Sequence, residues 1–341
     1  MFGKARFGLF LFVVARGSST GDSPDPDAGR VDSSIGKDAV ADAPTGNDAT
    51  TTDGQTADAS PDAALPSVRF VAMGDTGKGN KEQGDVAAGI AAKCQKDGCD
   101  FVQLLGDNIY DSGVGSTSDP EWTAKFVTPY QGIALDFWAV LGNHDYGANG
   151  AGTDFPRGQF EIDYSKVNTK WHMPAAYWQR TVGDVGFFAA DTNMIFFYQD
   201  AKQRTDMTAW LAASKSTWKI ALGHHPYLSN GPHGNAGNYD GIPLVGANVK
   251  SFMDDVVCGK ADVYISGHDH NRQWLTATCK GTELIVSGAG ASTTALKTTN
   301  TTYFQKDTVG FLYVRISGKT FTAEFCDAQG NVEYTRTLTK P

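Results

Sequence analysis

Short groups of potential metal-ligand residues follow five separate apolar segments of this chain, and each group begins with a glycine. Their side chains supply carboxylate, amide and phenol oxygens together with imidazole nitrogens, which are donors that metal sites in proteins use. One such group would mean little, but five supply ligands for two adjacent cations, a centre that suits hydrolysis of phosphate esters. The groups are 74–75 (GD), 106–110 (GDNIY), 142–145 (GNHD), 223–226 (GHHP) and 267–270 (GHDH).

The residue types suggest how two cations would be shared. The carboxylate of Asp107 can give one oxygen to each cation, and the phenol of Tyr110, three residues later, can reach the same ion. A phenolate selects strongly for a ferric ion. Asn143 offers a neutral amide oxygen, and histidine imidazoles suit iron, zinc and manganese. His268 and His270 are two positions apart, so both face the same side of an extended loop.

The charge of such a centre would favour phosphate. The positive charge of a ferric and a divalent ion exceeds the negative charge of two carboxylates, a phenolate and a bridging hydroxide. Metal coordination also lowers the pKa of a bound water enough to provide a hydroxide nucleophile in mild acid. Tyr110 could instead only pack near the site, which would then hold two divalent ions. Asp75 alone would be read as a turn residue. Asp111 and Asp145 are expected to shape the loops rather than bind metal.

The hydrophobic pattern predicts an α/β fold in which strands precede the five groups. Short, continuous apolar segments are typical of buried strands, and several segments between them have helical spacing. Strands that alternate with helices indicate an α/β sheet, whose sites lie beyond the carboxyl ends of strands. The predicted strands are 68–73, 101–105, 137–141, 218–222, 263–266, 284–287, 310–316 and 320–325, and the predicted helical faces lie within 86–94, 207–211 and 249–256.

The first 66 residues differ in composition from the rest. Lys4 and Arg6 precede a short apolar segment, as in an export signal, and this segment is too short to span a bilayer. Residues 17–66 contain ten Asp and almost no large apolar side chain, which is typical of a disordered linker. We therefore predict an export signal at 1–16, a linker at 17–66 that could tether the protein to a cell envelope, and a catalytic domain at 67–341. A chance apolar N-terminus is the alternative.

Charge and cysteine content bear on partners and location. The net charge of −9 disfavours non-specific binding to nucleic acid. Five cysteines agree with an oxidising compartment, so we expect a periplasmic, cell-surface or secreted protein. Cys94 could pair with Cys99, and Cys258 with Cys279, which would leave Cys326 unpaired. Free buried thiols are the alternative.

Taken together, the five groups resemble those of the purple acid phosphatases, within the calcineurin-like metallophosphoesterases, and above all the small tartrate-resistant type. The resemblance runs from about residue 68 to the end of the chain. It implies a four-layer α/β/β/α sandwich with two packed mixed sheets, and an enzyme that acts on small phosphorylated substrates. We expect a monomer. Further matching residues are Trp171, Tyr177, Asp191, Thr192 and the turn at 287–290.

The resemblance also implies a role for each candidate residue. His144 and His233 would contact phosphate and assist the leaving group. Pro232 replaces a glutamate that the small mammalian-type enzymes often carry, so protonation would rest on these two histidines. His172 and His225 fall outside the ligand set, although His225 could line the cleft. The implied ligands are Asp75, Asp107, Tyr110 and His270 for the ferric ion, and Asp107, Asn143, His224 and His268 for a divalent iron, zinc or manganese ion.

Three functions fit this pattern. The first is an acid phosphatase for phosphate monoesters, and the second is a phosphodiesterase or nucleotidase with two divalent metals. The third is an exported binding protein whose phosphoesterase domain is inactive, but this would leave a ligand position empty and all seven are filled. The loops at 113–119, 148–157 and 230–241 offer few anchors for specificity, so a broad monoesterase is the simplest expectation.

Overall fold

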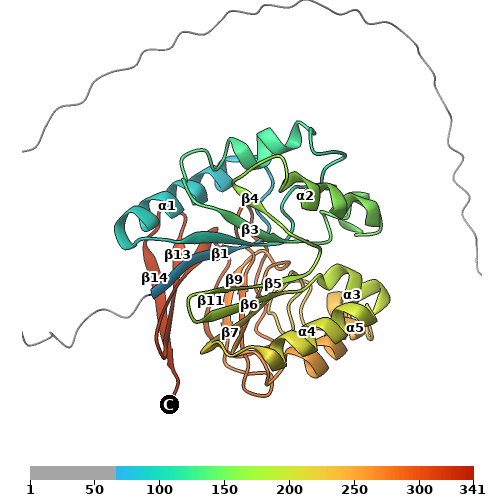
Figure 1. Ribbon diagram of the computed structural model, residues 1–341, viewed down its shortest axis with the longest axis vertical. Coiled ribbons are helices and arrows are strands. Elements are labelled where there is room, and N and C mark those ends of the chain that lie inside the picture. Colours follow the sequence, from blue (N-terminus) through green and yellow to red (C-terminus); the bar gives the residue numbers. More distant parts are fainter. Residues whose placement is uncertain (1–66) are drawn as a thin grey trace, which may run out of the picture. The chain divides into compact units, whose positions relative to one another are not determined.

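The computed structural model describes residues 67–341, which form four layers (Figure 1). Two mixed sheets pack face to face, helices α1 and α2 cover one sheet, and helices α3, α4 and α5 cover the other. Separate clusters of buried apolar side chains fill the three interfaces between these layers. The predicted four-layer sandwich is therefore confirmed. The predicted export signal and linker lie outside the described residues.

The first sheet has the strand order β14-β13-β12-β1-β2-β3-β4. Strands β1 to β4 run parallel, while β12 to β14 add an antiparallel half beside β1. The parallel strand β2 is buried along its whole length, as expected for a strand covered on both faces. The strands are β1 (Ser67–Met73), β2 (Phe101–Leu105), β3 (Phe137–Val140), β4 (Trp171–His172), β12 (Gly310–Ser317), β13 (Thr320–Asp327) and β14 (Val332–Thr339).

The second sheet has the order β11-β9-β10-β8-β7-β6-β5. Strands β6, β7, β8 and β10 are parallel, and β5, β9 and β11 pair antiparallel at the two sides. All eight predicted strands are present, and six others among the described residues were not predicted. Of these, β4 has two residues and β5, β11 and β14 are half-exposed, whereas β6 and β9 are buried inside the second sheet and were missed. This sheet contains β5 (Trp178–Val182), β6 (Val185–Ala189), β7 (Trp218–Leu222), β8 (Val263–Ser266), β9 (Arg272–Leu275), β10 (Glu283–Ser287) and β11 (Thr302–Lys306).

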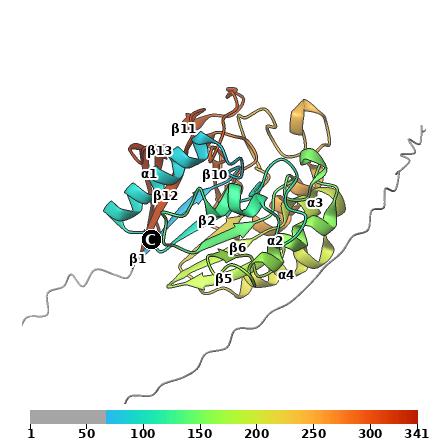
Figure 2. The same cartoon turned by 90° about the horizontal axis from the view of Figure 1, so that it is seen from above.

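Helices α1, α3 and α4 begin at side chains that cap them. The side chain of Asn80 accepts from the backbone N–H of Gln83 at the start of α1, and Asp191 caps α3 in the same way. Figures 1 and 2 place α1 and α2 at opposite ends of the first sheet. The helices are α1 (Lys81–Asp97), α2 (Gly158–Tyr164), α3 (Thr192–Tyr198), α4 (Ala201–Ala213) and α5 (Ala247–Phe252), with π-helical turns η1 (Thr123–Val127) and η5 (Met253–Val257) and 3-10 turns η2 (Ala148–Gly150), η3 (Phe155–Arg157) and η4 (Tyr239–Gly241).

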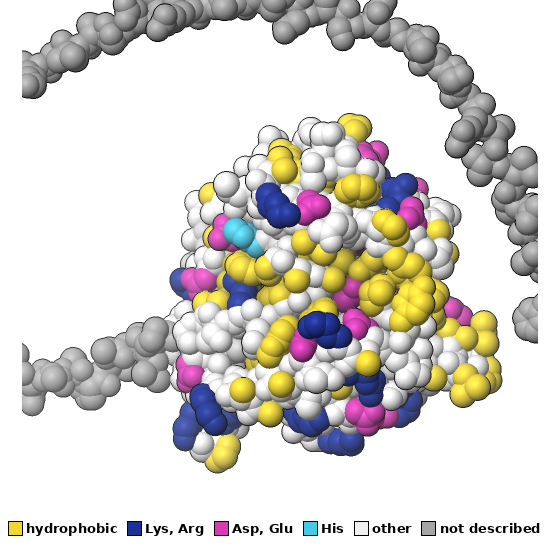
Figure 3. All heavy atoms as spheres, turned by 45° about the vertical axis from the view of Figure 1, so that its right-hand side comes forward, with side chains coloured by type: hydrophobic (Ala, Val, Ile, Leu, Met, Phe, Trp, Pro, Cys, Tyr) yellow, Lys and Arg dark blue, Asp and Glu magenta, His cyan; other side chains and the backbone are white. Residues whose placement is uncertain are grey.

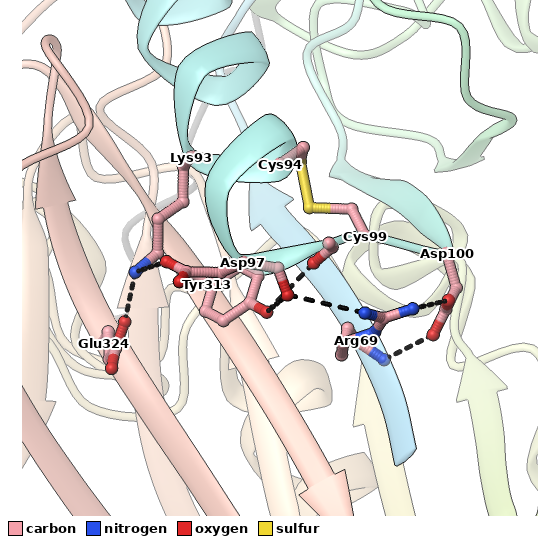
Figure 4. The surroundings of a disulfide bond; sticks show 9 residues. Arg69, Lys93, Cys94, Asp97, Cys99, Asp100, Tyr313 and Glu324 are labelled. Atoms are coloured by element: carbon pink, nitrogen blue, oxygen red, sulfur yellow. Dashed lines mark hydrogen bonds and ion pairs between the residues drawn. A yellow bond between two sulfur atoms is a disulfide. The ribbon is translucent and has the colours of Figure 1, made fainter. Parts of the chain in front are cut away.

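Two disulfides join the pairs that the sequence suggested. Cys94 in α1 bonds to Cys99 just before β2 (Figure 4), and Cys258 bonds to Cys279. Cys326 is unpaired and buried in β13. The structure thus selects, from the arrangements that the sequence left open, the two disulfides over free thiols.

Ion pairs near the first disulfide attach the end of α1 to the sheet beneath it. Lys93 is buried and pairs with Asp97, at 2.7 Å, and with Glu324 of β13, at 2.5 Å (Figure 4). The Arg69 guanidinium of β1 lies 2.9 Å from the carboxylate of Asp100. These contacts fix α1 against β1 and β13, and so support the sheet whose strands lead into the five groups of predicted ligands.

Candidate metal centre

The five predicted groups follow the carboxyl ends of β1, β2, β3, β7 and β8, and the two sheets bring them together. Gly74 after β1 donates its N–H to the carbonyl of Ser287 in the other sheet, at 2.7 Å. The N–H of Asp75 donates to the carbonyl of Gly106, at 2.9 Å, and so joins two of the groups directly. The expectation that the groups follow strands is confirmed.

Two of the leading glycines are required by close packing. A Cβ atom at Gly142 would lie 2.3 Å from Oδ1 of Asp107. A Cβ atom at Gly106 would lie 2.6 Å from Nδ1 of His224, and Gly106 has a φ of +87° that disfavours other residues. The glycine that begins each of these groups thus lets neighbouring loops approach closely enough for their side chains to meet.

Three of the predicted ligands have a left-handed backbone. The φ angles are 60° at Asp75, 53° at Asp107 and 68° at His268. Such conformations are uncommon outside glycine and cost about 1–3 kcal/mol each where they are strained. They persist where the surrounding structure holds them, and they concentrate at functional sites.

Each of the two carboxylates has one oxygen held by a backbone N–H. Oδ1 of Asp107 accepts from the N–H of His144 at 2.8 Å, and Oδ2 of Asp75 accepts from the N–H of His268 at 2.9 Å. The second oxygen of each carboxylate faces the other predicted ligands. The loops therefore orient the carboxylates as well as carrying them.

A first set of four donors surrounds the phenol oxygen of Tyr110. This oxygen lies 3.0 Å from Oδ1 of Asp75, 2.9 Å from Oδ2 of Asp107 and 3.0 Å from Nε2 of His270. These are the four residues implied for the ferric ion.

A second set surrounds Nε2 of His224. This nitrogen lies 2.9 Å from Oδ1 of Asn143, 3.1 Å from Nδ1 of His268 and 3.3 Å from Oδ2 of Asp107. Oδ2 of Asp107 is thus common to both sets. The structure brings together all seven side chains that were expected to bind metal, and their role as ligands stays a prediction.

The donor separations fit bound cations. Two ligands at a right angle around a cation, each about 2.1 Å from it, are about 3 Å apart, which agrees with the distances above. Nδ1 of His224 contacts the carbonyl of Leu105 and Nδ1 of His270 contacts Oγ of Ser292, both at 2.9 Å, so the Nε2 atoms are left for the centre.

Burial gives a second reason to expect cations. The carboxylates of Asp75 and Asp107 are 0% and 2% exposed, and neither forms an ion pair with a lysine or arginine of residues 67–341. Buried carboxylates are costly without positive partners, and here the imidazoles of His224 and His270 are the only side chains of the described residues that form ion pairs with them. Two cations between the donor sets would compensate this charge.

The pKa values of the proposed ligands show which protons a bound cation would have to displace. Burial and the carboxylates of Asp107 and Asp75 raise the pKa of the Tyr110 phenol well above its usual value. Burial lowers the pKa of His224, but the charges of Asp107 and Asp75 outweigh it and raise this pKa to about 9. Burial and neighbouring imidazoles lower the pKa of His268 well below its usual value. Metal binding would therefore release protons from Tyr110 and His224, so metal retention depends on pH.

The two other predicted histidines flank the donor sets. The ring of His144 lies 4.3 Å from that of Tyr110, and its Nδ1 is 2.7 Å from the carbonyl of Asp111. The ring of His233 stacks on His268 at 4.1 Å. One histidine therefore adjoins each donor set.

A buried polar network connects two of the ligand loops. The carboxylate of Asp145 accepts from the N–H groups of Gly142, Asn108 and Ile109, at 2.8, 2.8 and 3.1 Å. The amide of Asn108 also donates to Glu161 at 3.0 Å. Burial and the negative charge of Asp107 raise the pKa of Asp145 to about 7. This agrees with the expectation that Asp145 shapes the loops. The part of Glu161 was not foreseen, because it lies on a separate helix.

A cavity of about 170 Å³ opens beside the second donor set. His225 is buried and lines it, as the sequence allowed. Its lining includes no lysine or arginine. On the face shown in Figure 3, hydrophobic side chains gather in a band while charged side chains are scattered. The lining residues are Asn143, Gly150, Ala151, Asn193, Phe196, Phe197, His225, His233, Tyr239, Asp240, Val245 and His268.

Comparison with known proteins assigns the family. Residues 68–272 match the calcineurin-like phosphoesterase family. The chain belongs to this family. The phosphoesterase is 29% identical to tartrate-resistant acid phosphatase type 5 of Mus musculus over 310 residues. This aligned region covers 79% of this chain and 89% of the mouse protein. The phosphoesterase is also 29% identical over 252 residues to purple acid phosphatase 7 of Arabidopsis thaliana, which covers 66% of this chain and 70% of that one. The resemblance to purple acid phosphatases is confirmed.

Solved structures share the fold of this phosphoesterase. GAP50, the anchor in the inner membrane complex of Plasmodium, has a TM-score of 0.66 at 22% identity, over 80% of this chain and 89% of that one. Purple acid phosphatase PPD1 from yellow lupin has a TM-score of 0.63 at 19% identity, over 81% of this chain and 54% of that one. In residues 67–341 of the phosphoesterase, no helix has the length and apolar character needed to cross a membrane.

Proposed function

We propose that this phosphoesterase is an acid phosphatase that hydrolyses phosphate monoesters at a centre of one ferric and one divalent ion. The observation that carries the proposal is that Oδ2 of Asp107 lies within 3.3 Å of donors from both sets. A centre of two close cations requires a shared ligand of this kind. The names of the relatives from Mus musculus and Arabidopsis thaliana support the reaction class.

The proposed ligands divide by chemistry as well as by position. The set around Tyr110 contains two carboxylates and a phenol, hard anionic donors that favour a ferric ion. The set around His224 contains two imidazoles, an amide and the shared carboxylate, which suit divalent iron, zinc or manganese. When bound, two cations would neutralise charge on phosphate and supply an acidic water.

In this proposal His144 holds the phosphate and His233 gives a proton to the leaving group. Nδ1 of His144 is engaged by the carbonyl of Asp111, so its Nε2 remains for a phosphate oxygen. His233 lines the cavity, and we assign it to the leaving-group oxygen, which must gain a proton when an alkyl ester is cleaved. The cavity has no lysine or arginine in its lining, so it suits the leaving group rather than additional phosphates.

Export is part of the proposal. Two disulfides among residues 67–341 support an oxidising compartment, because disulfides persist outside the cytosol. We propose a domain organisation of an export signal at 1–16, a linker at 17–66 and a catalytic domain from residue 67.

A catalytically inactive anchor is the second candidate, and the shared fold with GAP50 is the observation that favours it. An inactive domain needs no converging donors. In this chain, all seven proposed ligands lie in the two donor sets, which favours the enzyme.

The test is hydrolysis of p-nitrophenyl phosphate in mild acid by the metal-loaded protein, beside bis(p-nitrophenyl) phosphate. We expect the monoester to be cleaved at least about 100-fold faster, and Asp107→Asn to lose at least about 1,000-fold in kcat. The matched control is Asp163→Asn on α2, which removes a carboxylate from a surface ion pair with Lys166. Faster cleavage of the diester would favour the phosphodiesterase, and no cleavage of either ester would favour the inactive anchor.

A further inference from the structure

We propose that Asp240 is a positioning residue that orients the imidazole of His233 toward the leaving group. This inference rests on the proposed phosphatase function. Oδ1 of Asp240 lies 2.8 Å from Nδ1 of His233, and both residues line the cavity beside the second donor set. The only other ring nitrogen of His233, Nε2, is then the one available to a molecule in the cavity.

The loop that carries both residues is closed by its backbone as well. The N–H of Asp240 donates to the carbonyl of His233 at 2.8 Å. The N–H of His233 donates to Oδ1 of Asp269 at 3.0 Å. Asp269 is fully buried between the proposed ligands His268 and His270. The backbone of His233 is therefore fixed to the metal-site loop, and only rotation of its side chain is left to be controlled.

Two contacts control that rotation. The ring of His233 stacks on the ring of His268 at 4.1 Å with 30° between the planes, which restricts its tilt. Stacking does not distinguish a ring from the same ring flipped by 180°, because the two nitrogens exchange sides. The hydrogen bond to Asp240 makes that distinction, because its carboxylate accepts the N–H of Nδ1. In the imidazolium form the N–H of Nε2 then faces the cavity and is the proton that the leaving-group oxygen takes, which leaves neutral His233 with its N–H on Nδ1.

The backbone conformation of Asp240 is one in which glycine would be the least strained residue. Its φ is 57°, a left-handed conformation that glycine adopts at least cost. The next residue, Gly241, has a φ of 73°, so glycine is already used in this turn. An aspartate at the strained position retains a carboxylate there.

Stability does not explain the pair. The side chains of His233 and Asp240 are 37% and 53% exposed, and ion pairs between exposed side chains contribute little to stability. Removing the carboxylate should therefore leave the fold and the metal centre intact. This makes the role of Asp240 testable by kinetics.

The test compares two monoesters in wild-type and variant enzymes. p-Nitrophenolate departs without a proton, whereas the alkoxide of β-glycerophosphate needs one. Asp240→Gly removes the carboxylate without adding strain at a left-handed position. We expect kcat for β-glycerophosphate to fall about tenfold or more and kcat for p-nitrophenyl phosphate to fall less than about threefold. Asp240→Asn keeps an acceptor oxygen for the N–H of His233, but its amide can also donate to the ring, so it should recover only part of the loss.

Further measurements separate orientation from other effects. His233→Ala should show the same preference for the activated ester, and adding Asp240→Gly to it should cost nothing more, because residues that act as a unit are not additive. Metal content and thermal unfolding of each variant should match those of Asp163→Asn. Equal losses on both esters, or multiplying effects in the double variant, would overturn the proposal. A wild-type enzyme that cleaves neither ester would instead overturn the proposed function.

Discussion

The phenol oxygen of Tyr110 lies 2.9 Å from Oδ2 of Asp107, and the same carboxylate oxygen lies 3.3 Å from Nε2 of His224. The other oxygen of Asp107 accepts from the backbone N–H of His144. One oxygen atom therefore connects two sets of donors. This relationship separates a two-cation centre from two independent sites that happen to be close.

Tyr110→Phe tests the ferric assignment. We expect the purified wild-type protein to have a visible absorption band from phenolate-to-ferric charge transfer, and the variant to lose it. Iron should be retained, because Asp75, Asp107 and His270 remain. Tyr303→Phe, an exposed tyrosine on β11, is the matched control and should keep the band. A colourless wild-type protein with full activity would show that the centre holds a second divalent ion instead of a ferric ion.

His144→Ala separates phosphate binding from metal binding. The ring of His144 lies 4.3 Å from the ring of Tyr110, and its Nδ1 contacts the carbonyl of Asp111 rather than one of the seven proposed ligands. We expect kcat for p-nitrophenyl phosphate to fall about 100-fold while the metal content stays unchanged. His172→Ala is the control, because His172 stacks on Trp138 outside the site. Loss of metal from His144→Ala would show that this residue is a ligand.

Asp191→Asn should change how stability depends on pH. Burial raises the pKa of Asp191 to about 6, above the usual value of 3.8. The folded protein then holds a proton that the unfolded chain releases, so between about pH 4 and about pH 6 the free energy of unfolding falls as pH rises.

The asparagine variant lacks this proton. We expect the wild-type free energy of unfolding minus that of Asp191→Asn to fall by up to about 3 kcal/mol across that window. Urea unfolding of both metal-free proteins at matched pH gives the difference, in which other titrating groups cancel. A difference that stays constant or grows with pH would contradict the account.

Phe197→Ala tests the cavity as a leaving-group site. Phe197 lines it and packs against Phe196, with ring centroids 5.0 Å apart. Losing this aromatic contact should raise KM for naphthyl phosphate about fivefold and leave KM for β-glycerophosphate within about twofold. Tyr303→Ala, away from the cavity lining, is the control. An equal rise for both esters would mean that Phe197 supports the phosphate site and not the leaving group.

The sequence predicted those features that depend on a local pattern. The strands before the ligand groups are continuous apolar segments, and a glycine followed by ligand residues marks where each ends. The pairing of Cys94 with Cys99 follows from their closeness in the chain. The convergence of the seven side chains was expected from the donor types and from their place after strands, and the resemblance supplied how they divide between two ions. Spacing alone does not show that the end of β3 in one sheet lies next to the end of β7 in the other.

Other features have no local pattern. Strand β5 is half-exposed and α3 has seven residues, too few for a helical period to be recognised. The predicted helix over 249–256 divides into α5 and a π-helical turn. Glu161 reaches Asn108 from another helix. Asp240 lies in a segment rich in glycine and asparagine, where a carboxylate seven residues after His233 resembles any turn residue.

Anomalous diffraction from crystals of the metal-loaded wild-type protein tests the central claim most directly. The account predicts two peaks per chain about 3.5 Å apart, both next to Oδ2 of Asp107, with Tyr110 beside one and His224 beside the other. A single peak, or two peaks of which one lies away from Asp107, would contradict it.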